Sequence, residues 1–132
     1  MPVVRRFIIL SLAGYWCTIF VLTHMPARRL PAPAVSDKVA HMAAYFGLAA
    51  LLYAWLWVRY PARRTIGLWV IGICAAYGAA DELLQIPVGR SASLGDWLAD
   101  VAGAMIAVAI WELIRLGATA WRRSVTAQTL AA

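Results

Sequence analysis

Residues 39–58, VAHMAAYFGLAALLYAWLWV, form an apolar run that holds one histidine and no lysine, arginine, aspartate or glutamate. A helix needs about 20 such residues to cross a bilayer. Three further apolar runs occur at residues 7–22, 66–84 and 97–116, of which the last two carry acidic residues near their ends. None alternates polar and apolar residues as a membrane strand must. The sequence therefore predicts an all-α fold, an integral membrane bundle of four transmembrane helices. Their expected bounds are about residues 7–24, 37–58, 65–85 and 94–116.

The composition also indicates a membrane protein. The chain has 132 residues, of which 64% are hydrophobic and 14% charged, with a mean hydropathy of +0.74. Soluble proteins carry roughly 25% charged residues, and a soluble domain this short could not bury so much apolar surface. We expect one domain over residues 1–123 and a short C-terminal tail over residues 124–132. The first run is expected to be a retained helix rather than a cleaved signal peptide, because Arg28 and Arg29 follow it.

The basic residues predict how the bundle sits in the membrane. Eight arginines precede the first helix, fill the loop between the second and third, or follow the fourth, whereas four basic residues lie on the other side. Basic loops favour the cytoplasm, so both termini are expected there. The net charge of +6 is not arranged as a basic face with interleaved aromatics, so nucleic acid is not an expected partner.

Three polar clusters interrupt the apolar chain on the predicted outer side. They are Asp37-Lys38-x-x-His41, Asp81-Glu82-x-x-Gln85, and Gly89-Arg90 followed by Asp96 and Asp100. Ionisable groups are costly in a membrane and are usually kept for function. The convergence of these clusters on one face therefore predicts a site.

In the second helix, Asp37 and His41 are four residues apart and share a face. A carboxylate beside the histidine would orient its ring. This pair suits a proton shuttle, a general base or an anion contact. It can also be a charge pair at a helix start, where the helix dipole favours an aspartate.

In the third helix, Asp81 and Glu82 are adjacent and cannot point the same way. We expect one of them to face the interior and the other to reach the surface or pair with Arg90. The fork of Arg90 suits a carboxylate or a phosphate. An ion-pair scaffold on the outer face remains a competing interpretation.

The start of the fourth helix carries Asp96 and Asp100 one turn apart, and either can pair with Arg90 or Lys38. A metal site built from His41, Glu82, Asp96 and Asp100 is conceivable, because one histidine with carboxylates suits a divalent ion. These residues come from three helices without a diagnostic local spacing. We therefore expect no metal and no cofactor.

Taken together, the motifs resemble the VanZ-like family of small bacterial membrane proteins, over roughly residues 36–108. The residues that carry the resemblance are Asp37-Lys38-x-x-His41, Asp81-Glu82-x-x-Gln85, Gly89-Arg90-Ser91-Ala92-Ser93, and Asp96 followed by Ala99-Asp100 and Gly103. The family's namesake is linked to low-level resistance to teicoplanin-type glycopeptides, so the resemblance implies a role in the cell envelope and a place in the bacterial cytoplasmic membrane. It also implies a set of ligand-binding residues: Asp37, Lys38, His41, Glu82, Gln85, Arg90, Asp96 and Asp100.

The leading functional hypothesis is a non-enzymatic protein that binds an anionic lipid or a lipid-linked cell-wall precursor at the outer leaflet. Arg90, Lys38 and His41 would contact the head group. The second hypothesis is an intramembrane enzyme acting on a lipid-linked phosphate or glycan, with His41 and Glu82 as the candidate catalytic acid and base. A small proton-coupled transporter is a third. Membrane lipids are expected partners, and homo-oligomerisation stays open.

Overall fold

The structure, a computed structural model, describes residues 2–25 and 36–131. Its elements are α1 (Pro2–Thr23), α2 (Asp37–Arg59), α3 (Ile66–Gln85), a short 3₁₀ turn η2 (Ile86–Val88) and α4 (Leu94–Ala131). The described residues contain no strand, and each of α1 to α4 includes a stretch long and apolar enough to cross a membrane. The predicted all-α bundle of four membrane-length helices is confirmed. Residues 26–35, which include Arg28 and Arg29, lie outside the described residues.

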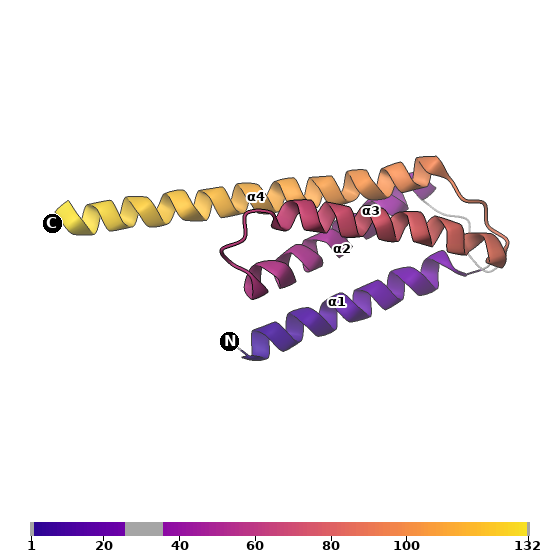
Figure 1. The fold of residues 1–132 in the computed structure, drawn as a ribbon, viewed down its shortest axis with the longest axis horizontal. Helices are drawn as coiled ribbons and strands as arrows, with labels where there is room; N and C mark the ends of the chain where they lie inside the picture. The colour runs from indigo at the N-terminus through magenta and orange to yellow at the C-terminus, as the bar shows by residue number, and fades with distance from the viewer. Residues whose placement is uncertain (1, 26–35, 132) are drawn as a thin grey trace.

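The helices run alternately up and down, so the two ends of the chain lie on the same side of the bundle (Figure 1). The most extensive contact is between α2 and α4, with α3 packed against both. In contrast, α1 lies mainly along α2 and touches α3 over only a short length. This arrangement brings the end of α1, the start of α2, the end of α3 and the start of α4 together.

Small residues allow α2 and α4 to approach each other closely. A Cβ at Gly103 would overlap the backbone carbonyl oxygen of Met42 on the facing helix. Ala104 and Ala107 continue the same buried face of α4. Helices in a membrane associate through such close packing, because lipid tails are as apolar as the side chains they would replace. The α2–α4 contact is therefore the frame on which the polar residues are placed.

The other end of the same contact is aromatic. The rings of Tyr53 and Trp111 stack with their centroids 5.4 Å apart. The Tyr53 hydroxyl donates to Glu112 Oε1 at 2.8 Å, and Glu112 also lies 3.5 Å from Arg115 Nε. Every ionisable group in this small network therefore has a partner. The network accounts for the position of Glu112, the one acidic residue far from the polar clusters.

Side-chain caps fix the helix ends near the polar clusters. The Ser36 hydroxyl accepts a hydrogen bond from the Val39 N–H at 3.4 Å, and the Ser93 hydroxyl accepts one from the Asp96 N–H at 3.2 Å. Such caps satisfy N–H groups that have no partner inside the helix. Gly89 ends η2 with a φ of 79°, a left-handed conformation that glycine adopts without strain.

The fourth helix is longer than expected. It continues past residue 116 and through the expected tail, as far as Ala131. Residues 117–131 contain no proline and only one glycine, Gly117. A single glycine costs about 1 kcal/mol in a helix, which is too little to end one made otherwise of tolerant residues. The apolar part of α4 ends earlier, at Trp121.

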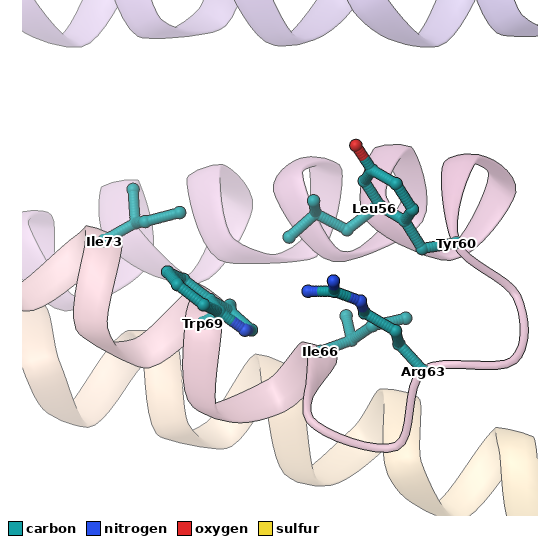
Figure 2. Close-up of a pocket in the computed structure, with 6 residues that line it drawn as sticks. All are labelled: Leu56, Tyr60, Arg63, Ile66, Trp69 and Ile73. Atoms are coloured by element: carbon teal, nitrogen blue, oxygen red, sulfur yellow. The ribbon is translucent and has the colours of Figure 1, made fainter.

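An apolar recess lies where α2 ends and α3 begins, at the opposite end of the bundle from the polar clusters (Figure 2). Figure 2 shows the Arg63 side chain reaching back from the connecting loop into it. The lining residues are Leu56, Tyr60, Arg63, Ile66, Trp69 and Ile73. The guanidinium of Arg63 lies over the Tyr60 ring, 5.5 Å from its centroid. An arginine over an aromatic ring is typical of the boundary between membrane and water. The recess does not bring a set of ionisable groups together.

Candidate functional site

The polar end of the bundle is the end at which α1 and α3 finish and α2 and α4 begin (Figure 1). It holds all eight residues that the sequence predicted to bind a ligand. Five of the six acidic residues of the chain lie there: Asp37, Asp81, Glu82, Asp96 and Asp100. Among the described residues, Lys38 and Arg90 are the lysine and arginine at this end. The described part of the site is therefore rich in carboxylates.

His41 is paired with Asp100 rather than with Asp37. Its Nδ1 lies 3.0 Å from Asp100 Oδ1, and the two side chains are 6% and 0% exposed. The partner predicted from spacing, Asp37, is the first residue of α2, and its side chain is 56% exposed. Asp100 is nearer because it faces His41 across the close α2–α4 contact. A pair between two helices, His41 and Asp100, therefore takes the place of the expected pair within α2.

The expectation that only one of Asp81 and Glu82 would face the interior is wrong. Both are buried, with exposures of 0% and 5%. Adjacent helix residues point about 100° apart, and α3 has α1 on one side and α4 on the other. Two directions are therefore interior for α3, and each acid takes one of them.

Asp81 points toward α1 and secures its end. One carboxylate oxygen accepts a hydrogen bond from the Thr23 hydroxyl at 2.9 Å, and the other accepts one from the Gln85 amide at 3.2 Å. The Nδ1 of His24 lies 3.7 Å from the first oxygen. This network holds α1 against α3 where the two helices otherwise touch little.

Glu82 points toward α4. One of its oxygens accepts a hydrogen bond from the Ser93 backbone N–H, in the turn before α4 begins. The other oxygen, Oε1, is buried and has no hydrogen-bond partner among the described residues. Asp100 Oδ2 is also buried and has no hydrogen-bond partner among the described residues. Buried carboxylate oxygens without partners are costly, so this pair is the most unusual feature of the site.

The two described permanent cations of this end, Lys38 and Arg90, pair with Asp96 and Asp37, and these four side chains form its rim. Arg90 lies 3.5 Å from Asp37 Oδ2 and donates to the Thr23 carbonyl at 3.4 Å. It therefore pairs with Asp37 and not with Asp81 or Glu82. Lys38 lies 3.3 Å from Asp96 Oδ1, and its side chain is 64% exposed. Of the pairings open to Asp96, the structure contains the one with Lys38.

Several site residues were not singled out from the sequence. Gly78 leaves room beside Asp100, because a Cβ there would lie 3.1 Å from Asp100 Oδ2. The indole N–H of Trp97 donates to the Ala75 carbonyl at 2.9 Å and fixes α4 against α3. His24 carried a signal, since it is an ionisable residue at the end of an apolar run. Gly78 and Thr23 carried none, because their types are common in membrane helices.

Two groups of side chains at this end have the composition of a cation site. One ligand atom from each of His41, Glu82 and Asp100 lies within 4.8 Å of the other two, and the same holds for Asp37, His41 and Asp96. Three of the four candidate ligands predicted from the sequence for a metal site, His41, Glu82 and Asp100, therefore meet, although they come from three helices. His41 belongs to both groups.

No curated protein and no solved structure matches this chain. A family model described as VanZ/LLP1 matches residues 7–115. The matched region includes every residue of the polar end that is discussed above. With four helices of membrane-spanning length, the chain is a multi-pass membrane protein. The family match confirms the resemblance predicted from the polar motifs, and the chain belongs to the VanZ/LLP1 family.

Proposed function

We propose that this protein binds the head group of an anionic lipid or of a lipid-linked cell-wall precursor at the outer leaflet of the bacterial cytoplasmic membrane. The observation that carries the proposal is the rim of the polar end, where, among the described residues, Lys38 pairs with Asp96 and Arg90 pairs with Asp37 beside the ends of four apolar helices. Lys38 is the most accessible of these groups, with 64% of its side chain exposed.

The described cations of the rim are paired with carboxylates. Lys38 lies 3.3 Å from Asp96 Oδ1, and Arg90 lies 3.5 Å from Asp37 Oδ2. A phosphate suits either cation, since ammonium and guanidinium groups are the usual phosphate donors. The rim carboxylates can accept hydrogen bonds from the hydroxyl and amide groups that a glycan-bearing head group carries.

The surface beside the rim suits an acyl or isoprenoid chain. Leu94 and Leu98 at the start of α4 are 71% and 54% exposed, and Leu83 at the end of α3 is 64% exposed. An amphiphile can therefore place its head group at the rim and its tail along these side chains. This combination of polar end and apolar flank favours a lipid-like ligand over a free polar solute.

The orientation follows from the basic residues. The arginines at the other end of the bundle favour the cytoplasm, which supports a polar end that faces the outer surface. Envelope precursors are carried on lipids in that leaflet, and the link of the family's namesake to teicoplanin-type resistance supports such a ligand. We therefore extend the proposal to a role in the cell envelope and in glycopeptide susceptibility.

Native mass spectrometry of the gently extracted protein tests the binding proposal. We expect the wild type to retain an anionic lipid that Lys38→Ala loses, because the lysine is exposed and its removal leaves the core intact. Arg90→Ala should lose the lipid too. Arg5→Ala is the matched control, since Arg5 is an exposed cation of α1 at the other end. Equal retention by all four proteins would overturn the proposal.

A susceptibility assay tests the envelope role. A teicoplanin-susceptible bacterium that expresses the wild type should show reduced susceptibility, and expression of Lys38→Ala at equal membrane abundance should not protect it. If the two proteins protect equally, the rim is not the part of the molecule that acts on the envelope.

A second candidate is an enzyme that acts on a lipid-linked phosphate or glycan. The observation that favours it is the buried His41–Asp100 pair beside Glu82, whose Oε1 has no hydrogen-bond partner among the described residues. His41 and Glu82 would act as acid and base, with Arg90 near the developing charge. The test is turnover of a panel of lipid phosphates. Turnover that Glu82→Gln abolishes would support the enzyme, and a lack of turnover of every lipid in the panel would contradict it.

A further inference from the structure

We propose that His41, Glu82 and Asp100 bind a divalent metal ion, with Zn²⁺ and Mn²⁺ as the best matches. One ligand atom from each residue lies within 4.8 Å of the other two, and the three residues come from α2, α3 and α4. All three side chains are buried. The proposal does not rest on head-group binding, because the rim residues take no part in it.

The charges around these residues favour a cation. Glu82 and Asp100 are 5% and 0% exposed, and no lysine or arginine is paired with either of them among the described residues. His41 is the one titratable partner, through its bond to Asp100. Two carboxylates buried beside one histidine carry an excess of negative charge that a divalent ion would balance.

The unpartnered oxygens point to the same conclusion. Glu82 Oε1 and Asp100 Oδ2 are buried and accept no hydrogen bond from a described residue. Buried polar groups in proteins nearly always have a partner, so each such atom calls for one. A metal ion between the two carboxylates would provide that partner for both.

The outer group of Asp37, His41 and Asp96 is a weaker candidate. Asp37 is already paired with Arg90, and Asp96 is already paired with Lys38. Their charges are balanced, and Asp37 is 56% exposed to solvent. The structure therefore favours the inner group, and the outer one provides a matched comparison.

The ligand set suits the proposed ions. Imidazole nitrogen and carboxylate oxygen both bind Zn²⁺ at about 2.0–2.2 Å, and carboxylates also suit Mn²⁺. Bonds of this length place neighbouring ligands roughly 3–4 Å apart, so small side-chain rotations would close the group on an ion. Three protein ligands leave further coordination positions open to water or to a phosphate oxygen.

Metal content measured by mass spectrometry is the first test. Tag-free protein in detergent is incubated with Zn²⁺ and separated from free ions, and the zinc bound per chain is determined. We expect about one ion per wild-type chain, as three protein ligands define one site. Glu82→Gln and Asp100→Asn keep the side-chain shape and should weaken zinc binding by more than the roughly 10–100-fold that losing an outer-shell residue costs.

Two variants serve as controls in the same experiment. Asp96→Asn removes a carboxylate of the outer group, and Glu112→Gln removes one at the other end of the bundle. Both should bind zinc as the wild type does. A wild type that binds no zinc and no manganese would overturn the proposal. So would zinc binding that Asp96→Asn loses while Glu82→Gln retains it.

X-ray absorption of the zinc-loaded wild type is independent of whether the variants fold. We expect a shell of nitrogen and oxygen ligands with the scattering pattern of one imidazole. A sulfur ligand would instead assign the ion to Cys17 or Cys74 and would contradict the proposal. A shell without imidazole would contradict it as well.

Discussion

His41 Nδ1 and Asp100 Oδ1 lie 3.0 Å apart across the contact between α2 and α4, although 59 residues separate them in the chain. The pair joins the two helices with the most extensive contact in the bundle. It also ties the polar end to the packing of the core, since Gly103 lies one turn farther along α4 in that same contact. Changes at either residue should therefore affect both stability and ligand binding.

A double-mutant cycle measures the coupling between this pair. In metal-free protein, His41→Ala leaves Asp100 buried with neither oxygen bonded, so the free energy of unfolding should fall by about 1–3 kcal/mol. The effects of His41→Ala and Asp100→Ala should combine with a coupling energy of about 0.5–3 kcal/mol. Reversible unfolding in detergent gives the values. Strict additivity would show that the pair contributes nothing as a pair.

Gly103→Ala tests the close approach of α2 and α4. The added Cβ meets the backbone of Met42, which cannot rotate away, so the helices must separate. We expect the free energy of unfolding to fall by about 1–3 kcal/mol, the usual cost of overpacking. Gly72→Ala is the control, because a Cβ there meets nothing within 4 Å and should leave stability unchanged or slightly higher. Equal effects of the two changes would contradict this account.

Thr23→Val tests how α1 is held. Valine has nearly the shape of threonine but cannot donate to Asp81, and a hydrogen bond to a charged group contributes about 1.5–3 kcal/mol. Hydrogen exchange should become faster in the last turns of α1 and remain unchanged in α2 and α4. Thr18→Val is the matched control, since Thr18 donates only to Gly14 within its own helix. If Thr18→Val accelerates exchange equally, the Asp81 contact is not what secures α1.

The orientation can be tested with single cysteines in a Cys17→Ser, Cys74→Ala background. Ala92 and Ala62 are exposed residues in the connections on opposite ends of the bundle. In intact cells a membrane-impermeant maleimide should label Ala92→Cys, and it should label Ala62→Cys only after permeabilisation. The reverse pattern would place the termini outside and the polar end in the cytoplasm.

Much of the fold could be predicted from the sequence, because it depends on local patterns. Apolar runs of membrane length define the four helices, the Ser36 cap marks where α2 begins, and Gly89 marks the turn after α3. The end of α4 was placed too early, because the loss of apolar character at the membrane boundary does not end a helix.

The site was predicted in location but not in pairing. Spacing along one helix indicated Asp37 as the partner of His41, whereas the structure supplies Asp100 from another helix. The burial of both Asp81 and Glu82 depends on α3 having neighbours on two sides, which a helix pattern alone does not show. Such contacts are set by which helices pack together, and that information is spread over the whole chain.

The length of α4 has a practical consequence for anyone who attaches a probe to this protein. Its 38 residues, at about 1.5 Å each, span about 57 Å, nearly twice the roughly 30 Å of a bilayer's hydrocarbon layer. The candidate membrane span ends at Trp121 among the described residues, so the later turns of α4 separate the bundle from a probe attached after that helix. A fluorescent domain attached after α4 is thus kept clear of the other helices.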